Sequence, residues 1–168
     1  MSVLNSAAKS AIPFAAVPLA LMLAAPAQAQ LITHKDLSYA MALTIATGAL
    51  DDCKAKGYAV SVVVVDRDGI NMVALRADGA GPHTMENARR KAYTALTFKM
   101  TTEAFAKALE TNPARRPQTT LPGVISIPGG VPVKVGDEVI AGVGLSGSPG
   151  VDEPCVRAGL AKVEDQLK

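Results

Sequence analysis

Soon after residue 30, a mostly apolar set of positions recurs at helical spacing. The recurring positions are Leu37, Met41, Thr44, Ile45 and Gly48. Spacings of three and four residues place such positions on one face of a helix. Thr33 followed by Asp36 resembles a capping box, and Gly57 closes the segment, so a helix is predicted between these points. Its alanines and Gly48 predict close packing against the sheet or a second helix.

A hairpin is predicted next. Residues 58–65 form a nearly continuous apolar run, bounded by Gly57 and by the turn sequence Asp66-Arg67-Asp68-Gly69. Such a run is typical of a central strand, and glycine suits the left-handed position of a tight turn. Residues 70–76 are predicted to return as the antiparallel partner, with no helix between the two strands.

The middle of the chain predicts two helices. Residues 77–83 are rich in turn formers, and Thr84 is a predicted N-cap. In the helix that follows, Ala88, Ala92 and Ala95 share a face that is predicted to point inward. Thr101-Thr102 is predicted to separate this helix from a shorter one that ends near Leu109.

Proline and glycine organise the C-terminal third. Residues 111–122 are proline-rich and poor in apolar side chains, which indicates either an ordered surface excursion or a flexible lid. The remaining predicted elements are a short strand at 124–127, a hairpin of residues 131–135 and 138–145, and a last helix from Asp152-Glu153 to near Leu167. The acidic pair would favour the start of that helix, either by capping it or by interacting with its dipole.

This order of elements describes an α/β fold, a layered sandwich in which a central antiparallel sheet is flanked by helices. Strands joined by hairpins argue against a parallel dinucleotide-binding sheet. If the first and last helices run antiparallel, the C-terminal end of one lies beside the N-terminal end of the other. Cys53 and Cys155 would then meet.

The first residues predict a secretory signal peptide rather than part of the fold. Lys9 precedes an apolar stretch at 11–25, and Ala27-Gln28-Ala29 is a small-x-small cleavage site. Residues 1–29 are therefore assigned to the signal peptide and residues 30–168 to a single domain, in a periplasmic or secreted protein. A permanent membrane anchor is the weaker alternative because the stretch is short and broken by prolines, and no later stretch is apolar enough to span a membrane.

Charge and cysteine content narrow the function classes. Seventeen basic residues face 15 acidic ones, so no basic excess indicates nucleic-acid binding. Only two cysteines are present, and in an oxidising compartment an even number usually pairs. A Cys53–Cys155 disulfide is predicted, with two buried free thiols as the alternative. Without a Cys-x-x-Cys or Cys/His cluster, a structural zinc site is not indicated.

Several motifs together resemble the GlcG/HbpS-like proteins, which include the C-terminal domain of PduO-type cobalamin adenosyltransferases. The matching stretches are, in order, Val64-Val65-Asp66-Arg67-Asp68-Gly69, Arg76-Ala77-Asp78-Gly79-Ala80, Lys91-Ala92-Tyr93-Thr94-Ala95, Gly129-Gly130-Val131-Pro132, and Gly142-Val143-Gly144-Leu145-Ser146-Gly147 leading to Asp152-Glu153. They span nearly all of the chain after the signal peptide. The resemblance implies a profilin-like sandwich that forms homo-oligomers, from dimers to octamers, and in several members binds haem.

The resemblance also implies candidate site residues. Haem iron needs an axial donor, and the chain has two histidines, His83 and His34. His83 lies in the glycine-rich loop before the second predicted helix and is the preferred iron ligand. His34 is the second choice, since PduO-like members carry a haem-binding histidine near their beginning. For each, an exposed loop or cap residue is the competing interpretation.

Five further positions, Gly129, Gly130, Arg76, Lys91 and Ser146, are candidates for a ligand pocket. Gly129 and Gly130 would let a ligand approach the backbone, or would only shape a turn. Arg76 and Lys91 would pair with haem propionates, or would form salt bridges to Asp78, Asp152 or Glu153. Ser146 lacks a nucleophile elbow, so hydrolase chemistry is not supported.

Three functions remain open from the sequence. The first is an exported haem-binding protein acting in haem sensing, storage or degradation. The second is an accessory protein or enzyme that takes a small acidic metabolite or a corrinoid in the same pocket. The third is a structural oligomer without a ligand. A binding protein is favoured over an enzyme.

Overall fold

A computed structural model describes residues 30–168, and the predicted signal peptide lies outside these described residues. His34 to Lys168 form one compact unit. Its elements are α1 (Tyr39–Ala55), β1 (Ser61–Val65), β2 (Asn71–Arg76), α2 (Thr84–Phe98), α3 (Thr102–Thr111), the 3-10 helix η1 (Pro113–Thr120), β3 (Gly130–Val135), β4 (Glu138–Ser146), α4 (Asp152–Ala161) and the 3-10 helix η2 (Glu164–Gln166). None of the helices in this part of the chain has both the length and the hydropathy that a membrane crossing needs.

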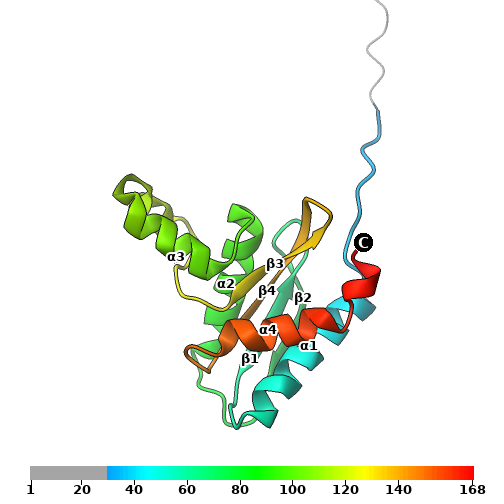
Figure 1. The fold of residues 1–168 in the computed structure, drawn as a ribbon, viewed down its shortest axis with the longest axis vertical. Helices are drawn as coiled ribbons and strands as arrows, with labels where there is room; N and C mark the ends of the chain where they lie inside the picture. Colours follow the sequence, from blue (N-terminus) through cyan, green and yellow to red (C-terminus); the bar gives the residue numbers. More distant parts are fainter. Residues whose placement is uncertain (1–29) are drawn as a thin grey trace, which may run out of the picture. The chain divides into compact units, whose positions relative to one another are not determined.

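The four strands form one antiparallel sheet in the order β2-β1-β4-β3. Helices α1 and α4 lie side by side on one face of this sheet, and α2 covers the other (Figure 1). The two predicted hairpins are β1-β2 and β3-β4, and they pair along β1 and β4 in the centre. The predicted layered α/β sandwich is therefore confirmed.

Strand β1 shows why the valine run is uninterrupted. Val62 and Val64 join the large core beneath α1 and α4, whereas Val63 and Val65 contact Ala88 and Ala92 of α2. Alternate side chains of a strand point to opposite faces, so a strand covered on both faces needs apolar residues at every position.

Glycines on β4 set the distance between the sheet and α2. A Cβ atom at Gly144 would lie 2.0 Å from the carbonyl oxygen of Ala88, and one at Gly142 would lie 2.2 Å from that of Ala92. No side chain fits in that space, so the helix backbone rests directly on the strand. A glycine also allows the close contact between α1 and α4, since a Cβ at Gly159 would lie 2.2 Å from the carbonyl oxygen of Ile45.

The predicted disulfide is present. Cys53 near the end of α1 bonds to Cys155 in the first turn of α4, and their Cα atoms are 5.5 Å apart. Both residues are fully buried. The antiparallel arrangement of the two helices brings the cysteines together as the sequence predicted.

Three helix ends differ from their predictions. Helix α1 begins later, because the Ser38 side chain caps it by accepting from the Met41 N–H, whereas Asp36 pairs with Arg67. The N-cap of α2 is His83 rather than Thr84, whose hydroxyl donates to the Gly81 carbonyl. Helix α4 ends at Ala161 and is followed by η2.

The strand predicted at residues 124–127 does not form. In its place the segment is held by side chains of α2. Thr94 Oγ1 accepts from the Ile125 N–H, and Arg90 donates to the Val124 carbonyl. These bonds satisfy the backbone without a neighbouring strand. The preceding proline-rich excursion is ordered as η1, whose first turn is capped by Asn112.

Candidate ligand-binding cavity

A cavity of about 870 Å³ lies where α2, α4 and the end of β4 meet the glycine-rich loop before α2. This volume is within the range of ligand and cofactor sites in proteins. Its apolar wall is formed by Ala59, Ile127, Pro128, Pro149 and Pro154. Of the site residues predicted from the sequence, the lining includes His83, Lys91 and Ser146, and does not include His34, Arg76, Gly129 or Gly130.

His83 occupies the N-cap position of α2 and is exposed on the lining of the cavity. Its ring lies over Gly81, where an added Cβ would come within 3.0 Å of Cε1. No side-chain capping bond engages the imidazole, so it is available to a ligand.

His34 lies apart from the cavity lining. Its Nε2 atom is 3.2 Å from Oδ2 of Asp36, and 43% of its side chain is exposed. Asp36 also pairs with Arg67, which anchors the segment before α1. The contacts of His34 are those of an exposed residue preceding a helix.

Arg76 stabilises the loop that carries His83. Its Nε and Nη2 atoms both donate to the carbonyl oxygen of Ala80, which is almost fully buried. Arg76 lines a separate cavity of about 460 Å³, next to Asp78. Its contact with Ala80 therefore fixes the loop, and the side chain is not part of the larger cavity.

Lys91 forms a buried ion pair. Its Nζ atom lies 2.6 Å from Oδ2 of Asp152, and both side chains are less than a tenth exposed. The same ammonium donates to the Leu145 carbonyl oxygen at 2.9 Å. Of the acidic partners considered from the sequence, the structure selects Asp152.

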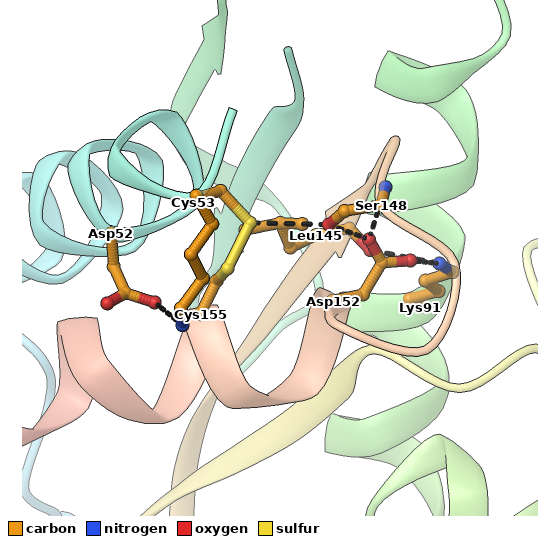
Figure 2. The surroundings of a disulfide bond; sticks show 8 residues. Asp52, Cys53, Lys91, Leu145, Ser148, Asp152 and Cys155 are labelled. Atoms are coloured by element: carbon orange, nitrogen blue, oxygen red, sulfur yellow. Dashed lines mark hydrogen bonds and ion pairs between the residues drawn. A yellow bond between two sulfur atoms is a disulfide. The ribbon is translucent and has the colours of Figure 1, made fainter. Parts of the chain in front are cut away.

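The ion pair is connected to the disulfide through Ser148 (Figure 2). Oδ1 of Asp152 accepts from both the N–H and the hydroxyl of Ser148, each at 2.8 Å. The Ser148 hydroxyl oxygen lies 3.2 Å from Sγ of Cys53. Asp152 thus receives three donors and does not cap α4, whose N-cap Val151 makes no side-chain bond.

At Gly129 and Gly130, other atoms of the protein occupy the space that a Cβ atom would need. A Cβ at Gly129 would lie 2.6 Å from Cβ of Asp152, and its φ of +119° favours glycine. A Cβ at Gly130 would lie 2.3 Å from the Lys91 carbonyl oxygen. The pair therefore lets the start of β3 approach α2 closely, and neither glycine lines the cavity.

Several polar residues of the site were not identified from the sequence. They are Ser148, Asn87, Glu103 and Arg157. Glu153 accepts from Arg157 through Oε1, and its Oε2 is buried with no partner among the described residues. A serine four residues before the acid that opens α4 is a local signal that could have indicated the Ser148–Asp152 contact. The other three residues become neighbours only through the tertiary fold.

Within residues 30–168, no group of three or more His, Cys, Asp or Glu is placed to hold a metal ion. One available imidazole beside an apolar wall could supply a single ligand to a metal that is already held by a cofactor.

Comparison with known proteins agrees with the fold. A family model described as "Haem degrading protein HbpS-like" matches residues 37–161. Protein GlcG of Escherichia coli (strain K12) is 32% identical over 111 residues, which are 66% of this chain and 81% of GlcG.

Solved structures show the same architecture. A crystal structure of HbpS is 38% identical, with a TM-score of 0.75, over 80% of this chain and 94% of HbpS. An HbpS double mutant from Streptomyces reticuli is similar to the same degree, with 37% identity, a TM-score of 0.75, and coverage of 83% and 97%. A PduOC–haem complex, at 23% identity and a TM-score of 0.69 over 76% and 94%, shares the fold. The chain belongs to the HbpS-like family.

Proposed function

We propose that this chain binds haem in the cavity lined by His83. The observation that carries the proposal is an imidazole without a capping bond on the wall of a cavity of about 870 Å³. The family description, which names haem degradation, supports haem as the ligand, and a relative with the same fold was crystallised as a haem complex.

The residues present fit this cofactor. Ala59, Ile127 and Pro128 offer an apolar surface of the kind that a porphyrin ring contacts. Bound haem would supply an iron centre for ligand binding or redox chemistry, and its porphyrin leaves an axial position for a protein donor. His83 would hold that position, while Arg76 keeps the loop of His83 in place through Ala80.

A haemin titration tests the proposal. The Soret band of haemin is expected to shift in a saturable way with the wild-type protein. His83→Ala is expected to weaken haemin binding by about tenfold or more, since an axial bond contributes more than one ordinary hydrogen bond.

The chain offers a matched control. His34→Ala removes the other histidine, which lies outside the cavity lining, and is expected to leave the affinity unchanged. Equal losses in both variants, or a wild-type protein that gives no saturable shift, would contradict the proposal.

We also propose that residues 1–29 direct export, that residues 30–168 form the mature domain in the periplasm or outside the cell, and that this domain is a homo-oligomer. A disulfide between fully buried cysteines supports an oxidising compartment. If residues 1–29 are removed on export, the intact mass of the exported protein should correspond to a chain starting at Gln30. If the domain is a homo-oligomer, light scattering should give a mass above that of the monomer. A retained leader, or a monomer at all concentrations, would count against these assignments.

Within the haem proposal, sensing, storage and degradation are the candidate roles. A small acidic metabolite as ligand has less support, because the two cations on the lining already pair with carboxylates.

A further inference from the structure

The charged groups around the cavity are arranged in pairs. Lys91 binds Asp152, and Arg157 binds Glu153, and all four residues belong to the lining. The remaining charged side chain, Glu103, forms no ion pair with a described residue and is exposed in the first turn of α3. Two cations against three carboxylates leave the lining with a net negative charge when His83 is neutral.

The two cations on the lining, Lys91 and Arg157, differ in how freely they could leave their carboxylate partners. The Lys91 ammonium is buried and also donates to the Leu145 carbonyl, so it cannot turn to a ligand without leaving Asp152 unpaired. Arg157 is 59% exposed and donates Nε and Nη2 to the same oxygen, Oε1 of Glu153. Arg157 is therefore the cation that a change at Glu153 would release.

The second carboxylate oxygen of Glu153, Oε2, lacks a hydrogen-bond donor among the described residues. Oε2 is buried and accepts no hydrogen bond from any described residue. A buried acceptor without a donor is unfavourable, so beside Glu153 a ligand that carries an N–H or O–H group is favoured over one that carries only acceptors. A ligand carboxylate at this position would instead meet a second negative group.

From these contacts we propose that the cavity selects by charge: the part of the ligand that enters it is neutral or cationic, and carboxylates are kept at the opening. The selection comes from the pairing of Arg157 with Glu153, which leaves no cation on the lining free to bind an anion. This rests on the proposed function only in its application to haem, whose propionates would then point outward; the charge selection itself holds for any ligand of the cavity.

Two probes of similar size and opposite charge test the selection without haem. Benzylamine and benzoate are titrated separately into the wild-type protein, and binding is followed by NMR at the amide signals of Ser146 and Gly147, which line the cavity. Benzylamine is expected to bind at least about tenfold more tightly than benzoate, since a like charge placed beside a carboxylate is strongly disfavoured. Benzoate binding as tight as benzylamine binding would overturn the proposal, as would no change with either probe.

A pair of substitutions tests whether the selection comes from the Arg157–Glu153 ion pair or only from the total negative charge of the lining. Glu153→Gln removes the partner of Arg157 and is expected to raise the affinity for benzoate by about tenfold or more, because a released guanidinium binds a carboxylate through two donors. Glu103→Gln removes the same charge from the same lining and releases no cation, so it is expected to change benzoate binding by less than about threefold. Equal effects of the two variants would show that the pairing has no special role and would overturn the proposal.

Haemin and its dimethyl ester extend the test to the proposed function. The ester is expected to bind within about threefold of haemin, because propionates at the opening make no buried ion pair. A loss of more than about tenfold on esterification would place the propionates on a protein cation and contradict the selection. If neither porphyrin binds while the benzylamine preference is observed, haem binding fails and the charge selection stands.

Discussion

Replacing Cys53 and Cys155 together by alanine is expected to lower the free energy of unfolding by about 3–5 kcal/mol. The bond joins residues separated by 102 positions, so it removes a large amount of chain entropy from the unfolded state. Both sulfur-bearing side chains are also fully buried between α1 and α4, and alanine gives up part of that contact. For a domain of this size the melting temperature should fall by about 10–15 °C.

Denaturant unfolding and calorimetry measure this loss, and reduction of the wild-type protein by a dithiol should reproduce most of it. Lys56→Ala is a matched control, because it breaks an exposed ion pair with Asp52 one turn from Cys53, and should change stability by less than about 1 kcal/mol. Thiol counting on the denatured wild-type protein should find two thiols only after reduction. Two reactive thiols without reductant would contradict the disulfide, and an unchanged unfolding midpoint would contradict its contribution.

The second large effect is expected at the buried ion pair. Lys91→Met should destabilise the protein by about 3–5 kcal/mol, since it leaves the Asp152 carboxylate buried without its cation. Asp152→Asn should have an effect of the same sign, because it leaves the ammonium of Lys91 beside a neutral amide. Both variants also weaken the connection between α2 and the start of α4.

A double-mutant cycle measures the interaction energy between Lys91 and Asp152 apart from the effect of each single substitution. Lys91→Met combined with Asp152→Asn should cost less than the sum of the single changes by about 1–3 kcal/mol, since neither charge is then left alone. Arg157→Met serves as the control, because the Arg157 side chain is 59% exposed and its pair with Glu153 should contribute less than the buried pair of Lys91 with Asp152. Additive effects of the two changes would show that the contact between Lys91 and Asp152 contributes little energy.

Local signals predicted most of the elements. The apolar run before Asp66 became β1, and the hairpin expected at 131–135 and 138–145 became β3 and β4. These predictions succeeded because strand alternation, turn residues and helical spacing are properties of neighbouring residues. The strand expected at 124–127 failed for the opposite reason: its backbone bonds to Thr94 and Arg90, which lie about 30 residues earlier in the chain.

The candidate site was predictable only in part. The sequence proposed Lys91 either as a ligand clamp or as a salt-bridge partner, and the choice depended on Asp152, 61 residues later. The structure favours the salt bridge, since burial leaves the ammonium no access to another partner without breaking it. Gly129 and Gly130 raised a similar question, because a missing Cβ makes space without indicating what fills it. The backbone of α2 and the side chain of Asp152 fill that space.

The contact between the disulfide and Ser148 has a practical consequence for how this protein should be produced. Cys53, Ser148 and Asp152 form a continuous path from the covalent bond to the cavity wall (Figure 2). Material made in a reducing cytoplasm, or purified with a thiol reductant, would carry two thiols at the far end of that path. Ligand affinities measured on such material would refer to a protein in which the contact between Cys53 and Ser148, next to the cavity-lining Asp152, is altered. The oxidation state of the cysteines should therefore be established before any titration is interpreted.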